Sequence, residues 1–99
     1  MTETLVIFDE PISDDKGARY SVQAMGRQRD DALWEGWLEF LPLAGNAERI
    51  SSGRETTQPN RNAVEYWAQG LTRVYLAGAL QRATGSAPKI DREREAFES

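Results

Sequence analysis

The sequence predicts an α+β domain in which a small antiparallel sheet carries a C-terminal helix on one face. Two patterns lead to this prediction. Apolar and polar residues alternate over residues 18–24, which is the period of a strand with one buried face. Apolar residues recur at steps of three and four over residues 64–78, which is the period of a helix with one buried stripe. We therefore expect three or four strands followed by this helix.

The first two expected strands are separated by turn residues. Residues 5–8 form a short apolar run that stops ahead of Pro11, which suits a buried or half-buried strand. Residues 14–17 form a turn by composition, and Gly17 can adopt a positive φ there. The alternating strand follows, and its predicted core face consists of Ala18, Tyr20, Val22 and Ala24.

The third expected strand covers residues 32–41. One of its faces is apolar, whereas the other mixes large apolar residues with Glu35 and Glu39. This pattern is typical of a central strand, or of a strand whose second face is partly covered. The apolar face consists of Ala32, Trp34, Leu38 and Phe40.

Residues 48–57 are the candidate for a further antiparallel strand. Only Ile50 is large and apolar in this stretch, so periodicity contributes little to the assignment. Residues 51–53 combine two serines with a glycine, which indicates a β-bulge or a strand at the edge of the sheet.

The helix is expected to start at Asn62, because residues 62–65 have the spacing of a capping box. Gly70 can end one helix and Thr72 can begin another, so the sequence allows one kinked helix or two helices. We favour one helix over residues 62–84. Its predicted core stripe consists of Val64, Trp67, Ala68, Leu71, Val74, Tyr75 and Gly78, and Leu76 and Leu80 widen it.

Composition divides the chain into a single domain over residues 1–84 and a tail over residues 85–99. The 99 residues suffice for one hydrophobic core. In the tail, acidic and basic residues alternate, and little can be buried beyond Ile90 and Phe97. We therefore expect the tail to be charged and mobile.

The chain contains neither cysteine nor histidine. The first absence excludes disulfides and thiolate metal sites, and the second removes the usual general base near neutral pH and the commonest metal ligand. The sequence also lacks the motifs that bind phosphates or dinucleotides. We therefore expect a protein that is not an enzyme and that carries no cofactor or metal.

The N-terminal residues are acidic, and the first apolar run stops after four residues. A secretory signal peptide needs a basic start and a longer apolar stretch. No segment approaches the roughly 20 apolar residues of a membrane span. We therefore expect a cytoplasmic protein that makes no membrane contact.

The polar stretch over residues 53–62 is the predicted working surface. It contains no large apolar side chain and runs into the helix, where backbone N–H groups and the positive end of the helix dipole are exposed. Trp37 shares a strand face with two glutamates and is therefore the tryptophan expected at the surface. Tryptophan and arginine commonly anchor protein interfaces. The predicted partner-binding residues are Trp37, Arg54, Glu55, Thr57, Gln58, Asn60 and Arg61.

These features predict an interaction domain that binds a protein partner of unknown identity or a second copy of itself. A homodimer through the helix would use the apolar surface of residues 71–80. Two interpretations of Glu55 stay open. In a functional role it accepts hydrogen bonds from a partner or pairs with the adjacent Arg54, and in a structural role it satisfies backbone donors at the helix entry or closes a salt bridge with Arg61.

Two other functions compete with this prediction. A nucleic-acid-binding module would need Arg27, Arg29, Arg54 and Arg61 to converge on one face, against a net charge of −4 and the glutamates beside the exposed tryptophan. A small anion or metabolite could instead bind at the helix N-terminus, where Arg54 and Arg61 flank the backbone N–H groups.

Overall fold

A computed structural model describes residues 1–45 and 48–85 of the chain. The predicted charged tail therefore lies, from residue 86 onward, outside the described residues. The elements in chain order are β1 (Thr2–Ile7), β2 (Ile12–Ser13), β3 (Arg19–Gln28), β4 (Trp34–Pro42), β5 (Ile50–Gln58), α1 (Arg61–Gln69) and α2 (Arg73–Thr84).

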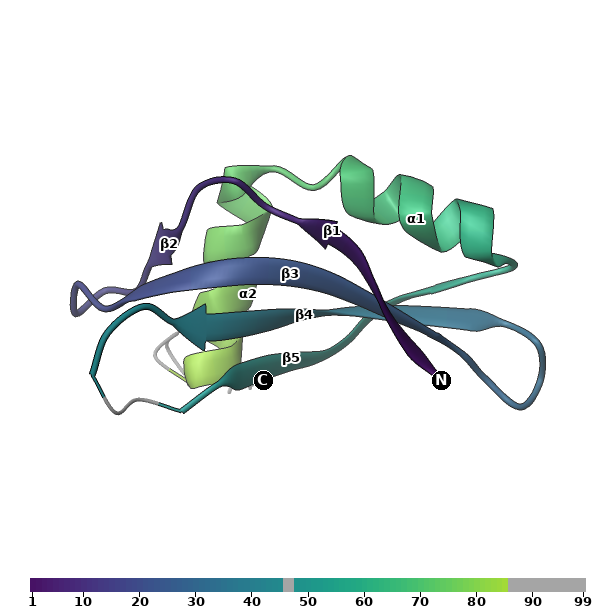
Figure 1. The fold of residues 1–99 in the computed structure, drawn as a ribbon, viewed down its shortest axis with the longest axis horizontal. Coiled ribbons are helices and arrows are strands. Elements are labelled where there is room, and N and C mark those ends of the chain that lie inside the picture. The colour runs from purple at the N-terminus through teal and green to yellow at the C-terminus, as the bar shows by residue number, and fades with distance from the viewer. Residues whose placement is uncertain (46–47, 86–99) are drawn as a thin grey trace, which may run out of the picture.

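The predicted α+β class is confirmed: a five-stranded antiparallel sheet carries two C-terminal helices. Strands β1, β3, β4 and β5 are neighbours in that order, and β2 also pairs with β3. In Figure 1, α2 lies behind the sheet and α1 lies along its upper side, so both helices leave the front face uncovered. The strand that the sequence did not predict is β2, which has only two residues and is too short to show a period.

The strand pairing is regular in the middle of the sheet and irregular at β5. The β3–β4 pair runs without a shift from Tyr20 opposite Pro42 to Gln28 opposite Trp34. The β4–β5 pair shifts register on both sides of Trp37, and Gly53 has a φ of +76°. Glycine adopts this left-handed conformation without a steric penalty, as bulges often require. The predicted bulge at residues 51–53 is confirmed, and β5 lies at one end of the strand order.

The start of β4 differs from the sequence prediction. Ala32 was expected on the apolar face of the strand, but it lies in the turn before β4 and is exposed. Its φ of 71° is left-handed, and its N–H donates to the Arg29 carbonyl at 3.0 Å. Ala18, which was expected on the core face of the preceding strand, is likewise exposed just before β3. Alternation therefore predicted the strand interiors, whereas the hydrogen bonds of the turns determine where the strands begin.

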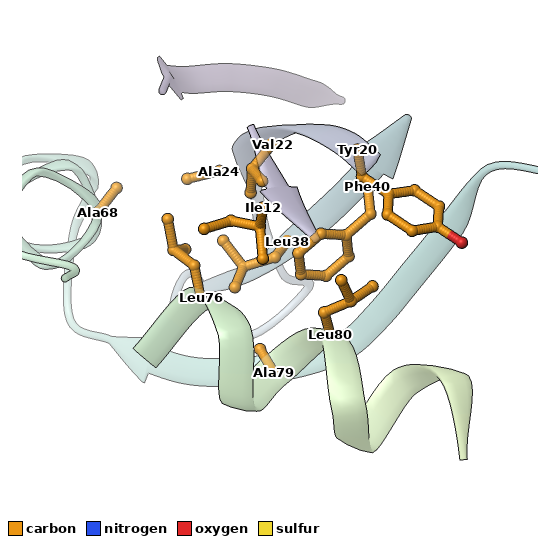
Figure 2. Close-up of a cluster of buried hydrophobic side chains, with 10 residues drawn as sticks. All are labelled: Ile12, Tyr20, Val22, Ala24, Leu38, Phe40, Ala68, Leu76, Ala79 and Leu80. Carbon is orange, nitrogen blue, oxygen red and sulfur yellow. The ribbon is translucent and has the colours of Figure 1, made fainter. Parts of the chain in front are cut away.

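The hydrophobic core lies between the sheet and the helices. Alternate residues of β3 and β4 point toward α1 and α2 and are fully buried. Gly36 belongs to this face because a side chain does not fit: a Cβ there would lie 2.7 Å from Trp67 Cζ3 and 3.0 Å from Val64 Cγ2. Figure 2 shows the main cluster, which consists of Ile12, Tyr20, Val22, Ala24, Leu38, Phe40, Ala68, Leu76, Ala79 and Leu80.

Helix α1 begins two residues earlier than the predicted N-cap. The Asn60 side chain accepts a hydrogen bond from the Ala63 N–H at 2.9 Å, and Asn60 has an extended backbone. Asn62 already lies inside the helix. Two asparagines of equal capping propensity stand two positions apart, and Asn60 is the one with the extended backbone of an N-cap residue.

The chain forms two helices where we favoured one. The Gly70 N–H closes α1 by donating to the Tyr66 and Trp67 carbonyls, and the Thr72 hydroxyl caps α2 by accepting from the Tyr75 N–H at 3.2 Å. The break changes the direction of the chain, so the stripe predicted for one helix does not continue into the second. Val74, predicted in the core, is 83% exposed, whereas the core face of α2 consists of Leu76, Ala79 and Leu80.

Candidate functional site

The face of the sheet opposite the helices is the candidate site. Residues Glu35, Trp37, Glu39 and Leu41 alternate with the buried residues of β4, so their side chains lie on this uncovered face and are half-buried. We call this surface the open face. Its central residues are Arg27, Glu35, Trp37, Glu39, Arg49 and Arg54.

Trp37 lies at the middle of the open face. It is opposite Met25 of β3 and Arg54 of β5 in the strand register. Its indole Nε1–H donates to Glu39 Oε2 at 2.8 Å, and the guanidinium carbon of Arg27 is 5.8 Å from the centroid of its ring. Contacts on two sides therefore hold the ring in one orientation, which lowers the entropy cost of using it in an interface.

The bulge in β5 separates two charged neighbours. Gly36 is opposite Thr56 and Trp37 is opposite Arg54, so the register passes over Glu55. As a result, Arg54 lies on the open face, whereas Glu55 contacts α2 on the covered face. Adjacent residues point to opposite faces in a regular strand as well, but an unshifted register would place Glu55 opposite Trp37. The bulge therefore puts Arg54 beside Trp37.

Two ion pairs on the open face are arranged in layers. Arg27 Nε donates to Glu35 Oε2 at 3.0 Å, and Arg49 Nε lies 3.4 Å from Glu39 Oε1. The side chains of the two arginines are 53% and 61% exposed, whereas those of the two glutamates are 13% and 16% exposed. The carboxylates thus lie beneath the guanidinium groups, and the charge presented outward is positive.

A hollow of about 200 Å³ lies beside Trp37 on the open face. The guanidinium of Arg54, one of its walls, is exposed and makes no ion pair or hydrogen bond within the part of the chain that the structure describes. The hollow therefore carries a cation that forms no ion pair with any residue the structure describes. It is lined by Arg27, Glu35, Trp37, Ser51, Gly53 and Arg54.

The predicted polar stretch does not form one surface. Of the predicted binding residues, Trp37, Arg54 and Thr57 lie on the open face, with Thr57 opposite Glu35. Gln58 is opposite Trp34 on the covered side, and its Nε2 donates to the Thr56 hydroxyl at 2.7 Å. The prediction grouped these residues because they are close in the sequence. In the structure, strand alternation and the bulge place them on different faces of the sheet.

Glu55 ties β5 to α2. Its Oε1 accepts hydrogen bonds from the Tyr75 hydroxyl and from Arg82 Nη2, the latter at 2.9 Å, and its side chain is 10% exposed. The Arg82 guanidinium carbon also lies 5.7 Å from the Tyr75 ring centroid. Partial burial, together with the neighbouring carboxylate, raises the pKa of Tyr75 above its ordinary value. Of the two interpretations of Glu55, the salt bridge is present, but its partner is Arg82 rather than Arg61.

The remaining predicted residues are engaged at the start of α1. Asn60 caps the helix, and Arg61 bridges Glu3 at 2.8 Å and Glu65 at 3.1 Å. The hydrogen bond with Glu3 is the main cause of the raised pKa of Arg61. An anion at this helix N-terminus would therefore compete with two carboxylates for Arg61, and Arg54 lies on the other face of the sheet.

The four arginines of the nucleic-acid alternative do not share one surface. Arg27 and Arg54 line one hollow, and Arg27 and Arg29 line another together with Glu35, although Arg29 also pairs with Asp31 at 3.1 Å in the β3–β4 turn. Arg61 lies on α1. The open face nevertheless includes a third arginine, Arg49, which the sequence prediction did not consider.

The apolar helix surface considered for a homodimer is mostly core. Leu76 and Leu80 are buried against the sheet, so they are not available to a second copy. Tyr66 and Val74 are the large apolar side chains of the two helices that are exposed, at 78% and 83%. They belong to different helices, and single exposed apolar residues are common on monomers.

The part of the chain that the structure describes, residues 1–45 and 48–85, offers neither a metal site nor a membrane-spanning helix. No group of three or more acidic side chains gathers there in a way that could hold a metal ion. No helix within these residues has the length and apolar content needed to cross a membrane. Comparison of the chain with family models, curated proteins and solved structures finds no match. The geometry of the open face is therefore the feature on which a proposed function rests.

Proposed function

We propose that the domain is a non-enzymatic cytoplasmic interaction module that binds a protein partner through the open face. The observation that supports this most directly is the setting of Trp37. An oriented indole ring lies on a sheet face that neither helix covers, with Arg27 over it and Arg54 beside it. Tryptophan and arginine carry a large share of the binding energy in protein interfaces.

The proposed surface differs from the surface predicted from the sequence, because it omits some of the predicted residues and includes others that were not predicted. It retains Trp37, Arg54 and Thr57, and it adds Arg27 and Arg49. Glu55 and Asn60 are assigned structural roles, because their side chains stabilise the α2 contact and the α1 N-terminus. The absence of cysteine and histidine supports binding over catalysis, since the usual nucleophile and general base are both missing.

Affinity purification from the native cytoplasm tests this proposal. The bait proteins are the wild type, the open-face variant Trp37→Ala with Arg54→Glu, and the control variant Tyr66→Ala with Lys16→Glu. The control loses an exposed aromatic ring and reverses one exposed charge at sites outside the open face. Circular dichroism first establishes that all three are folded.

We expect the wild type and the control to retain one and the same polypeptide in stoichiometric amount. The open-face variant should lose it, and the purified pair should reproduce this order of binding. Equal recovery by all three baits would locate the binding surface elsewhere and reject the proposal.

A further inference from the structure

We propose that the open face recognises an acidic segment of its partner, with a carboxylate against Arg54 and an apolar side chain on Trp37. This inference rests on the proposed function of the open face. It adds the chemistry of the segment that binds there.

Charge is layered on the open face, with the arginines outside the glutamates. The carboxylates of Glu35 and Glu39 are largely covered, whereas Arg27 and Arg49 extend outward from them. A partner that approaches the open face therefore meets guanidinium groups first, although the whole chain has a net charge of −4. Complementary potential at a contact surface favours the oppositely charged partner and disfavours basic ones.

Arg54 offers hydrogen-bond donors to a carboxylate of the partner. Its guanidinium has no partner among the described residues and lines the hollow beside Trp37. A guanidinium presents a planar set of donors that matches a carboxylate in a bidentate pair. The exposed Ser51 also lines the hollow and offers a hydroxyl donor for the same group. A carboxylate side chain thus fits both the volume and the hydrogen-bonding capacity of the site.

The amount of charge favours a peptide over a nucleic acid. Among the central residues of the open face, three arginines stand against two glutamates, which leaves one positive charge without a partner among the described residues. Nucleic-acid affinity comes largely from neutralising several phosphates, and an acidic protein repels a polyanion at long range. One uncompensated charge next to an indole ring is better matched to a segment with few carboxylates and a neighbouring apolar residue.

Nuclear magnetic resonance titration of the isotope-labelled full chain tests the inference. The probe is a short peptide in which glutamates alternate with leucine and phenylalanine, acetylated and amidated so that its ends carry no charge. The matched control replaces every glutamate by glutamine, and a single-stranded oligothymidylate is the third ligand. The signals to follow are the Trp37 indole N–H and the backbone amides of residues 51–54.

We expect the acidic peptide to shift these signals, to bind at least about ten-fold more tightly than the glutamine peptide, and to weaken as salt is added. Arg54→Gln should lower its affinity by about five-fold, as for an exposed charge-assisted contact. Arg19→Gln is the control, because it removes an exposed charge about 20 Å away along the sheet and should change the affinity little.

Other results would overturn the inference in distinguishable ways. Equal binding of the acidic and glutamine peptides would reject the acidic segment but leave an apolar contact on the open face in place. Tighter binding of the oligothymidylate at the same signals would assign the surface to nucleic acid. Absence of any shift with the acidic peptide would also reject the inference, and the affinity purification would then decide the proposed function alone.

Discussion

The two faces of strand β4 are built from alternate residues of one segment, yet they follow opposite rules. The covered face carries Gly36, Leu38 and Phe40, which are buried under the helices, and no described polar or charged residue is fully buried in the domain. The open face carries Glu35, Trp37 and Glu39, each half-buried and held by ion pairs or hydrogen bonds. Stability should therefore depend on the first face and binding on the second.

The largest expected effect is the difference in stability between variants of two aromatic residues of β4, one on each face of the strand. Phe40→Ala should lower the free energy of unfolding by about 3–5 kcal/mol, because it opens a cavity in a fully buried cluster. Trp37→Ala should cost less than about 1.5 kcal/mol, because its ring already contacts solvent and Glu39, which accepts its hydrogen bond, keeps the ion pair with Arg49. Urea denaturation of both variants measures the difference. Equal losses would mean that the open face is part of the core.

A second comparison uses the neighbours that the β5 bulge separates. Glu55→Gln should cost about 1–3 kcal/mol, because a largely covered carboxylate accepts hydrogen bonds from Tyr75 and Arg82. Arg54→Gln removes a guanidinium that has no partner among the described residues and should change stability by less than about 0.5 kcal/mol. Thermal denaturation measures both. The reverse order would place Arg54 on the covered side of the bulge.

A third comparison concerns the asparagines at the start of α1. Asn60→Ala should cost about 1 kcal/mol, because it removes the side chain that accepts from the Ala63 N–H. Asn62→Ala should be neutral or slightly stabilising, because Asn62 is exposed within the helix and alanine has the higher helix propensity. Chemical denaturation resolves a difference of this size. A larger loss for Asn62→Ala would restore the helix start predicted from the sequence.

Periodicity predicted most of the fold because it reports directly on burial. A period of two residues predicted the alternation around Tyr20 and Val22, and both of these residues are buried. The same period predicted which face of β4 is covered. The break at Gly70 was recognisable but not decidable, since a glycine is compatible with the end of a helix and with its interior. The short strand β2 left no period to detect.

The candidate site was harder to predict, because its contacts join residues far apart in the sequence. Glu55 and Arg82 come into contact only when α2 packs on β5, and no local sequence pattern indicates that they form an ion pair. Arg27, by contrast, could have been predicted from the sequence. Extending the alternation of β3 by three residues places Arg27 on the polar face of the strand, where it lies opposite Glu35. The layering of arginines over glutamates depends on side-chain exposure, which the sequence does not encode locally.

The smallest expected effect is a dependence of the covered side on alkaline pH. Tyr75 has a raised pKa in the folded chain, because its hydroxyl is partly buried and donates to Glu55. In the unfolded chain a tyrosine hydroxyl loses its proton at about pH 10. The folded state then holds the proton more tightly, so this contribution to stability is complete below about pH 10 and is lost as the pH rises through the folded value. Tyr75→Phe removes the titrating group. The free energy of unfolding of the wild type, less that of Tyr75→Phe, should therefore be constant near neutral pH and fall above about pH 10. A difference that stays constant up to pH 11 would mean that neither burial nor the hydrogen bond to Glu55 holds the proton on Tyr75 in the folded chain.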